Sequence, residues 1–299
     1  MGKKVVVCVI VSAIVLGLIA YTGSGETVSA QDTTAEGEYA AVNGLNLYYE
    51  VHGEGQPLIL LHGGLGGIIE FSQLLPALAE SRQVIAVELQ AHGHTADIDR
   101  PLSYEMMADD IAALIEHLGF ENADVLGFSL GGGVALQTAI RHPEVVRKLV
   151  LVSTPYRRAG IRPEFLAGMS SMNAEAAQAM LETPMYQLYS STAPNPEDWP
   201  TLVGKVGELV AQDYDWSEDV AAITAPTLIV VGDSDFIPAA HAMELFGLLG
   251  GDVAGDFVGM PNSQLAVLPS TSHFTMLSRT DLLLPVVTPF LDAPMPESE

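Results

Sequence analysis

Apolar and polar residues alternate at the start of the patterned part of the chain, at residues 38–42 and 45–51. Asn43 and Gly44 separate the two runs, and an Asn-Gly pair between alternating runs is a strong signal for a two-residue hairpin turn. The pattern therefore predicts an antiparallel pair of strands.

Further along, short apolar runs alternate with longer amphipathic segments, which is typical of parallel strands joined by crossover helices. The apolar runs lie at 58–61, 84–87, 124–126, 149–152, 226–231 and 264–268, and the amphipathic segments at 71–80, 103–118, 134–140, 239–249 and 281–291. Residues 250–262 have no periodicity and predict a loop. With the hairpin, the pattern predicts an α/β fold whose mostly parallel eight-stranded sheet is flanked by helices.

Residues 155–217 interrupt this alternation. They are rich in methionine, proline and aromatic residues, and prolines interrupt their helical stretches. We expect a helical cap inserted over the strand ends, which divides the core into 38–154 and 218–294 and leaves a tail at 295–299. Methionine and aromatic side chains in such an insert either pack internally or adapt to a bulky substrate, and the pattern leaves both readings open.

The N-terminus has the three zones of a secretory signal peptide: two lysines, an apolar run at 5–20, and small residues that end at Ala30. We predict cleavage after residue 30, export of the protein, and a short leader at 31–37. The alternative is a membrane anchor formed by residues 5–20, although that run is shorter than the about 20 residues that a spanning helix needs.

The charge and the cysteine count of the chain argue against several classes of partner and of functional site. The 299 residues carry 37 Asp and Glu against 12 Lys and Arg, a net charge of −25, which argues against nucleic-acid partners and anionic membrane surfaces. Cys8 is the single cysteine. It lies in the predicted signal peptide, so the sequence excludes an intramolecular disulfide, a cysteine metal site and a cysteine nucleophile from the folded region.

Residues 127–131 read Gly-Phe-Ser-Leu-Gly and lie between a predicted strand and a predicted helix. In this context Gly-x-Ser-x-Gly is typical of a sharp turn that presents the serine hydroxyl in an open cleft. The backbone N–H after the serine then lies at a helix N-terminus, where negative charge is stabilised. We predict that Ser129 is a nucleophile.

A serine nucleophile needs a base, normally a histidine that a carboxylate orients. Asp235 and His273 each follow a predicted strand. With Ser129 they would lie at the edge where open α/β sheets bind ligands, in the chain order Ser, Asp, His. We predict that His273 is the base and that Asp235 orients it, with Asp233 as the alternative acid.

The developing oxyanion of an acyl-transfer reaction needs two N–H donors. We expect the N–H of Leu130 to be one. Gly64, in the His-Gly-Gly motif at 62–64, is the natural second.

Residues 38–294 resemble the α/β-hydrolase family of the esterase, lactonase and haloperoxidase type. The resemblance rests on five motifs together, at 62–64, 91–95, 127–131, 232–235 and 272–274. It implies a serine mechanism through an acyl-enzyme, with no cofactor. Residues 95–103 also resemble the branch that contains bacterial carboxylesterases and macrolide-ring esterases.

The turn at 88–95 departs from the family pattern, which is usually Asp-x-x-Gly-His-Gly-x-Ser. It shapes the floor of the site, so the departure concerns the substrate preference. His92 and His94 form a His-x-His pair, but Asp97 comes three residues later, not two, and Ile98 follows it, so we expect no metal site.

The sequence thus predicts a carboxylic ester hydrolase whose partner is a small-molecule ester or lactone, with a macrolide ring as one candidate. The cap at 155–217 would supply the substrate contacts. The alternatives are a cofactor-free haloperoxidase or perhydrolase with the same triad, and a non-catalytic binding protein on a hydrolase scaffold.

Overall fold

A computed structural model describes residues 37–169 and 171–296. The predicted signal peptide at 1–30, the alternative anchor at 5–20, most of the leader at 31–37 and the last residues of the tail lie outside the described residues. Within them, no helix has the length and apolar character needed to cross a membrane.

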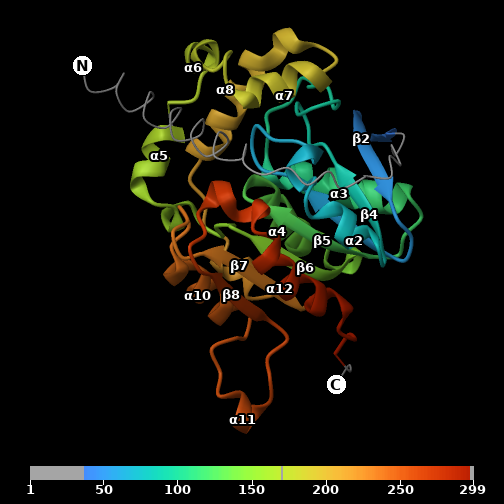
Figure 1. The fold of residues 1–299 in the computed structure, drawn as a ribbon, viewed down its shortest axis with the longest axis vertical. Helices are drawn as coiled ribbons and strands as arrows, with labels where there is room; N and C mark the ends of the chain where they lie inside the picture. Colours follow the sequence, from blue (N-terminus) through green and yellow to red (C-terminus); the bar gives the residue numbers. More distant parts are fainter. Residues whose placement is uncertain (1–36, 170, 297–299) are drawn as a thin grey trace.

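One eight-stranded sheet organises the molecule, in the order β1-β2-β4-β3-β5-β6-β7-β8 (Figure 1). The strands are β1 (Glu38–Val42), β2 (Leu45–His52), β3 (Gln56–Leu61), β4 (Arg82–Val87), β5 (Ala123–Phe128), β6 (Val146–Val152), β7 (Thr227–Gly232) and β8 (Gln264–Leu268). β2 pairs antiparallel with β1 and β4, and all other pairs are parallel. The predicted α/β fold with a mostly parallel eight-stranded sheet is confirmed.

The first hairpin turns at Asn43 and Gly44, both in the left-handed region with φ of 48° and 81°. Asparagine and glycine tolerate this conformation best, which is why the pair marks the turn in the sequence. The central strands β5 and β7 are buried along their whole length, as expected where helices cover both faces of a parallel sheet.

The sheet separates two hydrophobic clusters. The core helices are α2 (Leu75–Ala79), α3 (Tyr104–His117), α4 (Leu130–Arg141), α10 (Ala239–Leu248) and α12 (Thr280–Asp292). α3, α4 and α10 contribute to one cluster, and α2 and α12 to the other. Ser103 caps α3, because its Oγ accepts a hydrogen bond from the N–H of Met106.

In two segments, the structure differs in detail from the sequence-based prediction. The helix expected at 71–80 is a 3-10 turn, η1 (Ile68–Phe71), followed by the short α2. The loop expected at 250–262 contains one short helix, α11 (Gly255–Val258), which projects from the body of the molecule (Figure 1). Segments of about one turn lack the repeated apolar spacing that makes longer helices visible in a sequence.

Five helices lie between β6 and β7: α5 (Pro163–Met169), α6 (Ala174–Ala179), α7 (Pro184–Thr192), α8 (Trp199–Ala211) and α9 (Ser217–Val220). Figure 1 shows α5 to α8 grouped at one end of the molecule, on the side opposite α11. Pro184 and Pro200 lie in the first turns of α7 and α8, where proline is well tolerated. Trp199 is buried and its Nε1 donates to Ala177 O, and both residues belong to the same hydrophobic cluster as α3, α4 and α10.

Candidate active site

Ser129 lies between the end of β5 and the start of α4, with φ 54° and ψ −115°. A non-glycine residue in this region is strained, and such strain clusters at functional sites. The glycines on either side make the turn possible. A Cβ at Gly127 would lie 2.2 Å from Gly131 O, and a Cβ at Gly131 would lie 2.3 Å from Leu61 O.

The three predicted residues form one hydrogen-bonded chain. His273 Nε2 lies 2.9 Å from Ser129 Oγ, and His273 Nδ1 lies 2.9 Å from Asp235 Oδ1. They come from the ends of β5 and β7 and from the start of η5 (His273–Ser278), so three segments distant in sequence meet at one edge of the sheet. This is the geometry in which a histidine can take a proton from a serine hydroxyl.

Asp235 is buried, with 2% of its surface exposed. Burial alone would raise the pKa of its carboxyl, but hydrogen bonds outweigh it and hold the pKa below its usual value. The donors are His273, the Ser153 hydroxyl at 2.5 Å and the Ile237 N–H at 3.2 Å. Sequence reasoning missed Ser153, whose place directly after β6 was the available signal.

Asp233, the alternative acid, lies on the other side of the same turn. Its carboxylate accepts from the N–H groups of Ser270 at 2.9 Å and Thr271 at 3.3 Å. These bonds, chiefly the one from Ser270, lower the pKa of Asp233. Asp233 therefore fixes the loop that leads to His273, while Asp235 contacts the imidazole itself.

Aromatic rings surround the imidazole of His273, which is 6% exposed. Phe236 stacks on it with ring centroids 4.0 Å apart, and Phe128 lies at 4.9 Å. These contacts restrict the orientation of the ring and keep bulk water from it.

Gly64 and Leu130, the predicted oxyanion donors, line the same cavity as Ser129. Within residues 37–169 and 171–296, neither backbone N–H donates to a protein acceptor. The N–H of Gly131 donates to His62 O at 3.0 Å, which ties the His-Gly-Gly loop to the N-terminus of α4. Gly64 and Leu130 therefore come together at the cavity that Ser129 also lines.

Two buried histidines support this loop from behind. His62 Nε2 accepts from the N–H of Leu89, and His92 Nε2 accepts from the N–H of Leu65, each at 3.1 Å. Burial lowers their pKa values, to about 3 for His62 and about 4 for His92, so both rings are neutral and can accept. The turn at 88–95 thus supports the His-Gly-Gly loop from behind, and none of its residues lines the cavity that contains Ser129.

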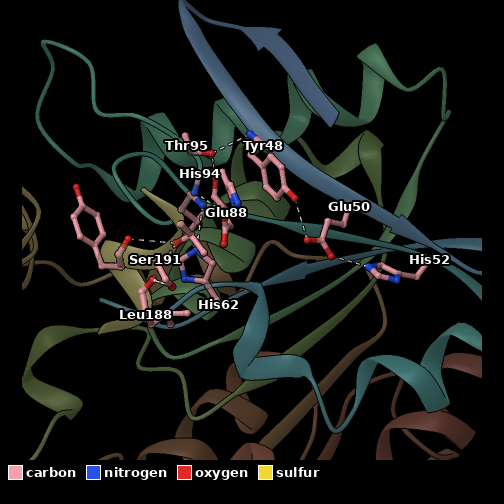
Figure 2. A network of polar contacts seen from close by, with 12 residues as sticks. Tyr48, Glu50, His52, His62, Glu88, His94, Thr95, Leu188 and Ser191 are labelled. Carbon is pink, nitrogen blue, oxygen red and sulfur yellow. Dashed lines mark hydrogen bonds and ion pairs between the residues drawn. The ribbon is translucent and has the colours of Figure 1, made fainter. Parts of the chain in front are cut away.

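Glu88 stands where the family pattern usually has aspartate, and the structure shows how the longer side chain is accommodated. Its carboxylate accepts from the N–H of His94 at 2.6 Å and contacts His94 Nδ1 at 2.8 Å. A Cβ at Gly93 would lie 2.2 Å from this carboxylate, so glycine leaves the room it needs. Figure 2 shows the network continuing through Thr95 and Tyr48 to Glu50 and His52.

These contacts involve three of the four ring nitrogens of the His-x-His pair at 92 and 94. His92 Nδ1 contacts Gln90 O at 2.9 Å while Nε2 accepts from Leu65, and His94 Nδ1 contacts Glu88. Among the described residues, no group of three His, Cys, Asp or Glu side chains could hold a metal ion.

A cavity of about 190 Å³ opens above Ser129. Most of its lining is apolar: Ile161, Phe165, Met169, Met172, Met180, Met185, Val206 and Val210 from residues 155–217, and Leu65, Phe128, Leu130, Phe236, Ile237 and Phe274 from the core. Glu70 is the one carboxyl group among the described lining residues. Sequence reasoning missed Glu70, because a single carboxylate in a short turn has no characteristic spacing.

Comparison with known proteins shows which protein family has this architecture. The sequence model of the alpha/beta hydrolase fold matches residues 56–195. The chain is 30% identical over 225 residues to a pimeloyl-[acyl-carrier protein] methyl ester esterase of Vibrio cholerae, a match that covers 67% of this chain and 84% of that protein.

Two further similarities extend over most of the chain. It is 26% identical to a dihydrolipoyllysine-residue acetyltransferase component of an acetoin cleaving system from Pseudomonas putida, over 78% of this chain and 63% of that protein. The solved enol-lactonase of Burkholderia xenovorans LB400 has the same fold, with a TM-score of 0.67 and 22% identity over 85% of this chain and all of that one. The chain is a member of the α/β-hydrolase family of hydrolases.

Proposed function

We propose that this protein is a serine hydrolase that cleaves carboxylic esters or lactones through an acyl-enzyme. The observation that carries the proposal is the hydrogen-bonded chain from Ser129 through His273 to Asp235, beneath an apolar cavity. The N–H groups of Gly64 and Leu130, residues that line the same cavity, would complete the requirements for acyl transfer.

In the first half-reaction, Ser129 Oγ attacks the carbonyl carbon while His273 Nε2 takes the hydroxyl proton. The N–H groups of Gly64 and Leu130 stabilise the negative charge on the carbonyl oxygen. The C–O bond to the alcohol then breaks, and the imidazolium gives its proton to the leaving oxygen. Asp235 orients the ring and stabilises its positive charge without taking the proton.

In the second half-reaction, water attacks the acyl-enzyme and His273 takes a proton from it. The bond to Ser129 Oγ breaks, the serine regains its proton, and the carboxylic acid leaves. With a lactone the alcohol and the acid belong to one ring, so the product is a single hydroxy acid.

The cavity supports an apolar substrate. Methionine side chains Met169, Met172, Met180 and Met185 line it, and flexible thioethers adapt to irregular and bulky groups. A large lactone, including a macrolide ring, is the candidate that the resemblance of residues 95–103 favours. Export of the protein through residues 1–30 stays a prediction.

A fluorophosphonate probe tests the nucleophile, because it reacts with an activated serine. Wild type should be labelled and Ser129→Ala should not, while both should unfold at similar temperatures. A panel of short-chain and long-chain esters, simple lactones and macrolides, followed by mass spectrometry of the products, then identifies the substrate. Equal labelling of both proteins would overturn the assignment of Ser129.

Turnover of halide and peroxide without ester hydrolysis would favour the haloperoxidase alternative. Ligand binding with neither labelling nor turnover would favour the binding-protein alternative.

A further inference from the structure

Glu70 places a carboxyl group in the cavity beside the candidate oxyanion hole. It lies in η1, the 3-10 turn that follows the His-Gly-Gly loop, and its Oε2 accepts from the N–H of Gly63 at 2.8 Å. Gly63 directly precedes Gly64, whose N–H is the candidate oxyanion donor. The carboxyl group therefore lies close to the position of a scissile carbonyl.

The glycine-rich loop is shaped around this carboxyl group. A Cβ at Gly66 would lie 2.4 Å from Glu70 Oε2, so a larger residue there would displace the carboxylate from this position. The loop also accepts a hydrogen bond from the backbone of Glu70, whose N–H donates to Gly67 O at 3.0 Å. The loop thus holds Glu70 in one place, as a binding group requires.

One carboxylate oxygen of Glu70 remains available to a ligand. Oε2 is held by Gly63, whereas no side chain or N–H of the described residues donates to Oε1. Across residues 37–169 and 171–296, no lysine, arginine or histidine forms an ion pair with Glu70. Tyr104 and His273 are the other titratable groups that line the cavity, and Glu88 lies behind the loop at Gly67.

A carboxylate without a cation is unfavourable in apolar surroundings. Burial accordingly raises the pKa of Glu70 to about 7, against the opposing hydrogen bond from Gly63. A ligand that brings its own positive charge would favour the ionised form. The net charge of −25 also favours the approach of a cation over that of an anion.

We propose that Glu70 binds an ammonium group of the substrate, so that the site selects apolar esters or lactones that carry an amine near the scissile carbonyl. This inference rests on the proposed hydrolase function for its catalytic consequence. The binding step itself does not depend on turnover.

Pairs of esters that differ only in charge test the proposal. One pair is p-nitrophenyl 6-aminohexanoate and p-nitrophenyl heptanoate, and the other is 6-aminohexyl benzoate and heptyl benzoate, because the amine can lie on either side of the ester. At pH 8 we expect kcat/KM of wild type to favour the amine in at least one pair by about tenfold or more, the effect of one charge-assisted hydrogen bond.

Two variants separate the charge of Glu70 from its structural role. Glu70→Gln keeps an acceptor for Gly63 but removes the charge, so it should abolish the preference, measured as the ratio of kcat/KM for the two esters of each pair. The matched control is Glu208→Gln on α8, the helix that also provides Val206 to the cavity; Glu208 is exposed, and its variant should keep the wild-type preference.

The pH dependence of wild type gives a test that needs no variant. The ratio of kcat/KM for amine and neutral esters should rise between pH 6 and pH 8 as Glu70 ionises. The ratio cancels any effect of pH on the chemical step, because that step is common to both esters. A flat ratio near one, with good turnover of neutral esters, would overturn the inference and leave the hydrolase function in place.

Binding to Ser129→Ala separates the inference from the proposed function. Calorimetry should show tighter binding of octylamine than of 1-octanol, and Glu70→Gln in the same background should remove the difference. That result would support the ammonium site even if no ester were hydrolysed. Equal binding of amine and alcohol would overturn it.

Discussion

Ser153 shows how one hydroxyl can control the candidate triad. It donates to Asp235 Oδ2, the carboxylate oxygen that does not contact His273, and it contributes to the lowered pKa of Asp235. A lowered carboxyl pKa keeps the ionised form, and its hydrogen bonds, down to lower pH; the contribution is lost as the pH falls through that pKa. Removing the hydroxyl must therefore weaken the triad first on the acid side.

We predict that Ser153→Ala lowers kcat/KM for a neutral ester by about tenfold, the effect of one hydrogen bond to a charged group. Because the pKa of Asp235 rises, the acid limb of the pH profile should move to higher pH. The control is Ser171→Ala, since Ser171 lines the same cavity but donates to Gly168 O. An acid limb that stays in place in Ser153→Ala would contradict this role of Ser153.

At the scale of elements, the site depends on how closely α4 approaches β3 and the loop that follows it. Gly131 makes this approach possible, because a Cβ there would lie within 2.5 Å of the backbone oxygens of both Leu61 and His62. Backbone atoms cannot move aside as a flexible side chain can. The position of Ser129 is thus fixed by the same contact that holds the His-Gly-Gly loop at 62–64.

We predict that Gly131→Ala destabilises the protein by about 3 kcal/mol, the cost of overpacking a rigid contact. Gly204→Ala is the matched control, since Gly204 lies inside α8 and a Cβ there has no neighbour within 4 Å. It should stabilise the protein by about 0.5–1 kcal/mol, because alanine is the better helix former. Urea denaturation measures both, and equal effects would contradict the packing argument.

Local patterns and tertiary contacts differ in what they reveal before the structure is known. Strand and helix positions follow from apolar periodicity, and Ser129, Asp235 and His273 follow from motifs at strand ends, so these residues could be named in advance. Glu70 and Ser153 could not, because each acts through one contact that only the folded chain brings about. The short η1 and α11 were missed because one turn carries no period.

At the scale of the whole molecule, Lys205 joins the helices of residues 155–217 to the core. From α8 its Nζ donates to Asp97 Oδ2 at 2.6 Å and to the carbonyl oxygens of Ile98 and Arg100, at 3.0 and 2.6 Å. The lysine side chain is 18% exposed, so these bonds are largely protected from solvent. Val206 and Val210 of α8 also line the cavity, so this connection joins part of the apolar lining to the core.

We predict that Lys205→Met, which keeps the apolar stem and removes the donor, lowers the free energy of unfolding by about 2 kcal/mol. Its hydrogen exchange should become faster in α8 and at residues 97–100. The control is Lys148→Met, because Lys148 donates to the carbonyl oxygens of Phe290 and Leu291 at 2.9 Å and joins α12 to β6. That variant should speed exchange in α12 instead, and unchanged exchange of α8 in Lys205→Met would show that other contacts hold these helices to the core.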